Sequence, residues 1–166
     1  MKTKAELMLA PAMDDHPLVS EILLNYARSL SQQPGMESLV LVAHGPNEDA
    51  ENEKWLEHLR AHADRIQEQL GFRRVEVVTL RDDAPQAVRD AATEELRAVV
   101  RQAGENSKVL ILPVLISVGD IQRKIRERLD GLPYVMSEKG LLEHSLAAEW
   151  IRQQALRFPA TTTAQK

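Results

Sequence analysis

The stretch SLVLVAHGP, residues 38–46, decides the fold expected for this chain. Its apolar run, Leu39–Ala43, ends abruptly in His-Gly-Pro, and an acidic segment of helical character follows from Asn47. A short apolar run bounded by turn residues is typical of a buried parallel strand. Open α/β sheets bind their ligands at the carboxyl ends of such strands. His44 stands at that end, and its imidazole is able to bind a metal ion or to transfer protons near neutral pH.

Strand-like and helix-like patterns alternate along the rest of the chain. Apolar runs at residues 39–43, 75–80, 109–116 and 134–136 predict strands, and Pro113 predicts that the third one ends or bulges nearby. Amphipathic stretches at 48–70, 85–103, 120–129 and 141–158 predict helices. The expected fold class is therefore α/β, a three-layer domain with a mainly parallel sheet of about four strands and helices on both faces.

The composition restricts the function classes. The net charge is −4 and the basic residues are dispersed among acidic ones, so no nucleic-acid partner is expected. The chain has no cysteine, so a metal would have to be bound by histidines and carboxylates. Neither a secretion signal nor a membrane span is evident, and the cytoplasm is the expected compartment. No GxGxxG, GxxxxGKS/T or GxSxG motif occurs, so neither a nucleotide cofactor nor serine hydrolysis is expected.

The first 37 residues do not fit as a leading strand–helix unit. Residues 6–10 predict a strand and residues 17–30 a helix, and this pair resembles the end of the chain. Aligned on His16 and His144, both segments carry Leu two residues later and Glu five residues later. The expected organisation is a segment at 1–37 that resembles the end of a preceding repeat, a domain at 38–158 and a flexible tail at 159–166.

Three motifs in order carry a resemblance to a known family. Asn52 lies eight residues after His44, the third strand leads through an apolar-Pro-apolar pattern into Ser117-Val118-Gly119, and His144-Ser145-Leu146 opens the last helix. This order resembles the CbiX-type sirohydrochlorin chelatases, small class II chelatases. The resemblance implies a lyase of cobalamin or siroheme biosynthesis that inserts Co²⁺, or alternatively Fe²⁺ or Ni²⁺, into a tetrapyrrole. The divalent metal is then a substrate, and the chain looks like the end of one repeat plus a complete second repeat.

The expected site lies at the carboxyl edge of the sheet. In such a chelatase His44 would bind the metal and help to remove pyrrole protons. Gly45 allows a ligand to approach closely. Arg81 follows the second strand and has a planar guanidinium suited to a substrate carboxylate. Ser117 and Gly119 follow the third strand and would complete the substrate cleft.

Ile121 occupies the position where the family usually has a second histidine. Asp120 beside it is the candidate replacement as a metal ligand, and the alternative for Asp120 is an N-cap of the next helix. Without a second ligand, the chain would be a catalytically degenerate repeat, the structural or interaction half of a homodimer or of a pair of chelatase repeats. The enzyme and the interaction half therefore both stay open.

The other polar residues of interest have structural interpretations. Asp83 is expected to cap the helix that Pro85 opens. His58 and His62 lie four residues apart but lack the Glu of a His-Glu-x-x-His motif, so they are expected on the helix surface. His16 and His144 are expected to cap or orient their helices.

Overall fold

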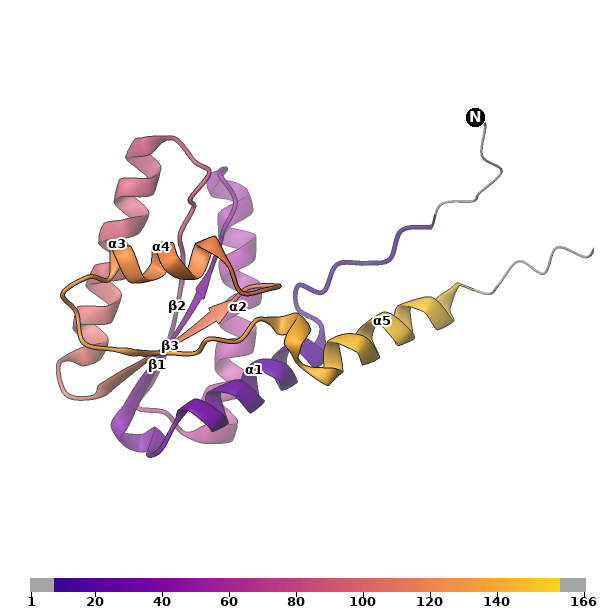
Figure 1. Cartoon of the computed structure of the whole chain (residues 1–166), viewed down its shortest axis with the longest axis horizontal. Coiled ribbons are helices and arrows are strands. Elements are labelled where there is room, and N and C mark those ends of the chain that lie inside the picture. The colour runs from indigo at the N-terminus through magenta and orange to yellow at the C-terminus, as the bar shows by residue number, and fades with distance from the viewer. Residues whose placement is uncertain (1–7, 159–166) are drawn as a thin grey trace, which may run out of the picture.

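A computed structural model describes residues 8–158, which contain a four-stranded parallel sheet with helices on both faces (Figure 1). The elements in chain order are α1 Pro17–Leu30, η1 Pro34–Met36, β1 Glu37–Ala43, α2 Asp49–Leu70, β2 Arg74–Thr79, α3 Gln86–Gly104, β3 Lys108–Val114, α4 Asp120–Arg128, β4 Val135–Met136, η2 Leu141–Glu143 and α5 Ser145–Arg157. The α/β fold class expected from the sequence is confirmed.

The sheet has the strand order β2-β1-β3-β4. β1 lies between β2 and β3, which explains why every residue of β1 is buried and why its sequence is apolar from Leu39 to Ala43. Ala43 is in register with Thr79 of β2 and with Val114 of β3. The carboxyl ends of these three strands therefore form one level edge, and the loops that follow them emerge side by side.

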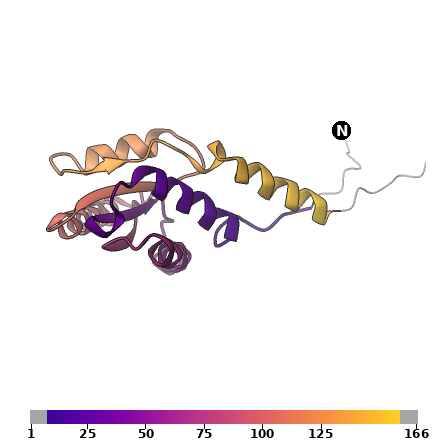
Figure 2. The ribbon, with the colours of Figure 1, turned by 90° about the horizontal axis from the view of Figure 1, so that it is seen from below.

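Alternate residues of β1 serve the two faces of the sheet. Leu39 and Leu41 belong to the core that α1 and α2 cover, whereas Val40 and Val42 belong to the core under α3 and α4. Because successive side chains of a strand point to opposite faces, an uninterrupted apolar run fits a strand that is covered on both sides. The resulting three layers are visible edge-on in Figure 2.

Pro113 lies inside β3, which ends one residue later at Val114. The carbonyl of Ile111 accepts a hydrogen bond from the Ser137 amide, so the backbone hydrogen-bonding groups of Ile111 point towards β4. Pro113 is two residues further along the strand, so its backbone nitrogen points to the same side, but it lies beyond the last residue that pairs with β4. The proline therefore interrupts no ladder bond, and the strand ends close to it as expected.

Several element boundaries differ from the expectation. Residues 8–10 form no strand, and the other residues of the strand expected at 6–10 lie outside the described part of the chain, as does the tail at 159–166. Pro85 is the residue before α3 rather than its first residue. The last helix begins at Ser145 after a separate 3-10 turn, because the Nδ1 atom of His144 accepts a hydrogen bond from the Leu146 amide.

α1 and α5 have the same cap but different surroundings. In α1, Nδ1 of His16 accepts a hydrogen bond of 3.2 Å from the Leu18 amide. In α5, Nδ1 of His144 accepts the equivalent bond of 3.2 Å from the Leu146 amide, so both expected caps are confirmed. α1 packs its apolar face on the sheet. α5 extends away from the body of the domain in Figures 1 and 2, and only Ala147 and Gln154 of it are buried.

Candidate functional site

His44 follows the last residue of β1 at the level edge formed by the three strand ends. Its Nε2 atom lies 3.4 Å from Oδ2 of Asp83, and the two side chains are 31% and 72% exposed. Asp83 belongs to the loop between β2 and α3, which emerges beside His44 because β1 and β2 are neighbours. The pair offers an imidazole nitrogen and a carboxylate oxygen to the solvent from one spot.

Asp83 does not have the role that the sequence predicted. The residue before α3 is Pro85, and no side chain caps this helix. The expectation of an Asp83 cap is therefore wrong, because the chain turns between Arg81 and Ala84 before the helix begins. Asp83 is the site residue that the sequence reasoning missed, and its position in the loop that follows β2, the neighbour of β1, was the signal that pointed to it.

A second carboxylate, Asp82, is held in an ion-pair cluster behind the His44–Asp83 pair. It accepts hydrogen bonds from Lys124 and, at 2.6 Å, from Arg128, both of which project from α4. Burial raises the pKa of Asp82, but the bond from Lys124 and the charges of Lys124, Arg128 and nearby His44 outweigh it, so the pKa lies below its ordinary value. Asp82 is consequently an anion that fixes α4 to the loop after β2.

Gly45 and Asn52 both pack closely against Thr79 at the end of β2. Gly45 has a φ of 75°, and a Cβ atom at this position would lie 2.5 Å from Cβ of Thr79 and 3.0 Å from Oδ1 of Asn52. The same Oδ1 atom accepts a hydrogen bond of 2.8 Å from the Thr79 hydroxyl. Asn52, eight residues after His44, is thereby bonded to the end of β2 beside the Gly45 turn.

Arg81 is committed to contacts inside the protein. Its Nε atom donates to the Pro46 carbonyl at 3.2 Å, it also donates to the Asn47 carbonyl, and it forms an ion pair of 2.7 Å with Asp49. The side chain is only 13% exposed. In this arrangement the guanidinium holds the loop after His44, and its expected contact with a substrate carboxylate stays a prediction.

Two of the residues expected in the site after β3, Ser117 and Gly119, lie in the exposed loop before α4, and Asp120 is the first residue of α4. Ser117, Gly119 and Asp120 are all solvent-exposed, and Asp120 is paired with Arg123 and Lys124 of its own helix. Hydrogen bonds from these two residues lower the pKa of the Asp120 carboxyl. Among residues 8–158, no group of three or more His, Asp or Glu side chains is close enough to hold a metal ion. A role for Asp120 as the second metal ligand stays a prediction, and Asp83 is the carboxylate found beside His44.

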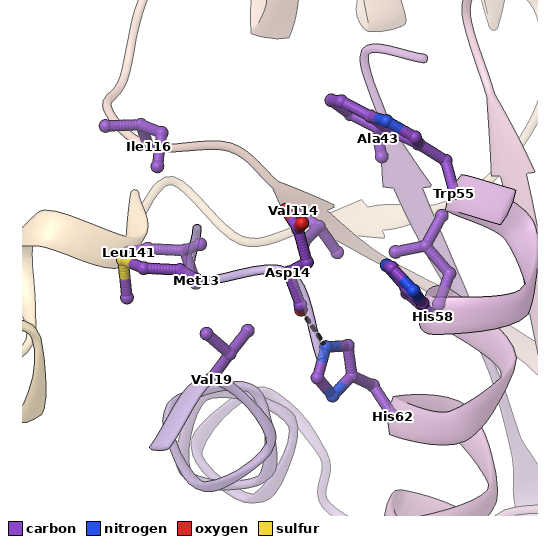
Figure 3. Close-up of a pocket in the computed structure, with 11 residues that line it drawn as sticks. Met13, Asp14, Val19, Ala43, Trp55, His58, His62, Val114, Ile116 and Leu141 are labelled. Carbon is purple, nitrogen blue, oxygen red and sulfur yellow. Dashed lines mark hydrogen bonds between the residues drawn. The ribbon is translucent and has the colours of Figure 1, made fainter. Parts of the chain in front are cut away.

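A pocket lies at the same edge of the sheet but on the α1–α2 side (Figure 3). Its volume is about 150 Å³, and its walls are mostly apolar. It is lined by Met13, Asp14, Val19, Ala43, Trp55, His58, Leu59, His62, Val114, Ile116 and Leu141. His44 is not among these residues, so the edge has two separate chemical features, the His44–Asp83 pair and an apolar pocket.

His62 departs from the expected surface position on α2. It is only 2% exposed; its Nδ1 atom lies 2.7 Å from the Ser20 hydroxyl, and its Nε2 atom lies 2.8 Å from the Asp14 carbonyl. A carbonyl only accepts, so Nε2 carries the proton and Nδ1 accepts from Ser20. Burial lowers the pKa of His62 below its ordinary value. The expectation was wrong because α1 packs against this face of α2, and His58, one turn earlier, is the half-exposed one.

The comparisons with known proteins agree with the fold. No family model and no curated protein sequence matches the chain. Among solved structures, the chain is similar to DR2241 from Deinococcus radiodurans, a multi-domain protein described as similar in structure to chelatases and as having two additional novel domains. The TM-score is 0.53 at 21% sequence identity, over 85% of this chain and 29% of that one. The chain thus has a chelatase-like fold and spans less than a third of the length of the protein it resembles.

No helix within residues 8–158 is long and apolar enough to cross a membrane.

Proposed function

We propose that this chain is a CbiX-like chelatase domain that binds a divalent metal, Co²⁺ in the first place, at His44 for insertion into a tetrapyrrole such as sirohydrochlorin. The observation that carries the proposal is the position of His44. Its half-exposed imidazole stands at the carboxyl end of the central strand of a chelatase-like fold, with the Asp83 carboxylate 3.4 Å away. This is the edge at which open α/β sheets bind ligands.

The His44–Asp83 pair suits both parts of a metal insertion. An imidazole nitrogen and a carboxylate oxygen are ligands that Co²⁺ and related ions accept. Insertion of a divalent ion into a tetrapyrrole releases two pyrrole protons, and neutral His44 is able to take up one of them while the other passes to water. The Asp83 carboxylate stabilises the imidazolium that forms. Since His44 has to be neutral for either task, we expect activity to fall as the solution becomes acidic.

Arg81 contributes by positioning the loop that follows His44. Its bonds to the Pro46 and Asn47 carbonyls fix the turn, and the packing of Gly45 on Thr79 fixes the same turn from below. Two protein ligands are fewer than a resident metal site normally has. The shortage fits a site that passes the ion on to a substrate, since water completes the coordination until the tetrapyrrole replaces it.

A spectroscopic assay tests this function. The purified chain is mixed with sirohydrochlorin and Co²⁺, and the change in the absorbance spectrum is compared for the wild type and for the variants His44→Ala, Asp83→Asn and His58→Ala. We expect insertion above the uncatalysed rate, a loss of at least about tenfold without His44, a smaller loss without Asp83, and no change without His58. Equal rates for the wild type and His44→Ala would refute the proposal.

A second function, the interaction half of a larger assembly, is favoured by α5. Leu23 of α1 is fully buried against the sheet, whereas Ile151, at the corresponding position of α5, is 55% exposed. Ile121 packs against the core under α4, which leaves no imidazole where the family usually has one. In this alternative, α5 covers another chelatase-like unit, as α1 covers the sheet here.

The molar mass in solution, measured by light scattering after size-exclusion chromatography, tests the homodimeric form of this alternative. A dimer that dissociates in Ile151→Asp, together with metal insertion that does not depend on His44, would favour the interaction half over the enzyme. A monomer with insertion that depends on His44 would favour the enzyme.

A further inference from the structure

The apolar pocket between α1 and α2 is a feature that metal insertion at His44 does not use. It lies beside the ends of β1 and β3, with Ala43 and Val114 in its floor, and α1 contributes Val19. Figure 3 shows the Trp55 and His58 rings projecting from α2 on the side of the pocket opposite Ile116 and Leu141. We propose that this pocket is a binding site for a small amine with one apolar or aromatic ring, the ring lying in the pocket and the ammonium group beside Asp14 and Trp55.

The size of the pocket argues for a single ring. Its volume is about 150 Å³. A dry protein cavity of about that volume, lined by aliphatic and aromatic side chains, accepts a benzene-sized molecule. The pocket is open to the solvent on one side, so this volume limits the part of a ligand that is enclosed, and a whole tetrapyrrole is too large to be enclosed there. The walls are apolar over most of their area, so the enclosed part of the ligand has to be apolar.

The charges around the pocket argue for a cationic head group. Asp14 is the only carboxylate among the lining residues, and none of the eleven is Lys or Arg. Trp55 adds an aromatic face, which attracts ammonium groups through its negative quadrupole. A ligand carboxylate would meet the Asp14 carboxylate, and among the described residues that line the pocket no Lys or Arg side chain is present to compensate for it. The pocket is therefore selective against the carboxylates that tetrapyrroles carry.

The site is preorganised by His62. Its Nε2–H donates to the Asp14 carbonyl at 2.8 Å, and its Nδ1 atom accepts from the Ser20 hydroxyl of α1. These two bonds tie the backbone of Asp14 and the start of α1 to α2. Ligand binding therefore costs little conformational entropy of the protein, because the site is already ordered.

Matched probes test the proposal on the whole chain. 2-Phenylethylamine and 3-phenylpropionate share a ring and differ in the charge of the head group, and their binding is measured by titration followed in ¹H–¹⁵N NMR spectra. We expect the amine to bind saturably, at least about tenfold more tightly than the acid, with shifts concentrated at the pocket. Absence of saturable binding at millimolar amine, or equal binding of both probes, would overturn the proposal.

Exposed residues supply matched variants that spare the core. Ile116→Trp fills the rim of the pocket and should weaken amine binding at least about tenfold, whereas Val118→Trp, in the same exposed loop but outside the pocket, should leave it unchanged. Asp14→Asn should remove the preference for the amine, while Asp15→Asn should keep it. Binding that Ile116→Trp leaves intact, or a preference that persists in Asp14→Asn, would place the amine elsewhere and refute the assignment.

Discussion

Replacement of His62 by alanine should destabilise the protein far more than the same change at His58. His62→Ala removes two buried hydrogen bonds, to Ser20 and to the Asp14 carbonyl. Each bond contributes about 1 kcal/mol net. The Ser20 hydroxyl, itself buried, and the Asp14 carbonyl are left without this partner, and the lost packing of the ring adds to the cost. We expect a loss of about 3 kcal/mol, or about 6–12 °C in melting temperature for a chain of this size.

The same histidine should make stability depend on pH. Its pKa in the folded state lies below the unfolded value of about 6.5, so the unfolded state takes up the proton first as the pH falls. The contribution of neutral His62 is therefore complete above pH ~6.5 and is lost as the pH drops towards the lower, folded-state pKa. This loss amounts to at most about 1.4 kcal/mol per pH unit.

Urea unfolding at pH 7.5 and pH 5.5, followed by circular dichroism, measures both effects. The His58→Ala variant is the control, since His58 is half-exposed and lies one turn away on the same helix. The wild type should lose stability between the two pH values, and His62→Ala should lose less. A cost below about 1 kcal/mol for His62→Ala, or an equal pH dependence in the two proteins, would refute the role assigned to His62.

Further variants test the turn, the ion-pair cluster and α5. Gly45→Ala should lower the free energy of unfolding by about 2–4 kcal/mol, because a left-handed backbone costs alanine about 1–2 kcal/mol and the new Cβ atom would also clash with Thr79. Gly71→Ala, where φ is 64° and no atom lies nearby, should cost about 1 kcal/mol. Equal costs of the two variants in thermal melts would contradict the packing argument. Asp82→Asn should lower the free energy of unfolding by about 2 kcal/mol at pH 7. The wild type should lose this stabilisation as the pH falls below about 3.9, towards the lower pKa of Asp82 in the folded state, whereas the variant should not show this loss. An acid titration of stability that the variant leaves unchanged would count against this. Ile151→Asp should change the free energy of unfolding by less than about 0.5 kcal/mol, and a larger loss would mean that α5 is already covered within the chain.

The strand positions were predictable because local sequence carries them. The uninterrupted apolar run at residues 39–43 required cover on both faces, and that is what β1 has between α1–α2 and α3–α4. The two histidine caps were predictable for the same reason, since an imidazole two residues before an orphan amide of a helix start is a local arrangement. Helix starts were less so, because Pro85 and Leu141 fit a position before the helix as well as one inside it.

The candidate site could be predicted only in part. His44 was found because a strand end can be read from the sequence. Its partner Asp83 was not, because the pairing depends on β1 and β2 being neighbours in the sheet. Arg81 was correctly placed at the edge, but its hydrogen bonds to Pro46 and Asn47 were not predictable. These bonds join residues that are 35 and 34 positions apart in sequence, and they form because the two loops meet in the fold.

The sequence by itself determined the periodicities, and through them the α/β class, the places of the four strands of the sheet and the position of His44 at a strand end. Only the tertiary structure decided which side chains share surroundings. It buried His62 under α1, left Ile151 of α5 exposed although its counterpart Leu23 is buried, and put the apolar pocket on the other side of β1 from the His44–Asp83 pair. The physical reason is that burial and pairing depend on which elements pack together, and contacts between distant segments leave no periodic trace in the chain.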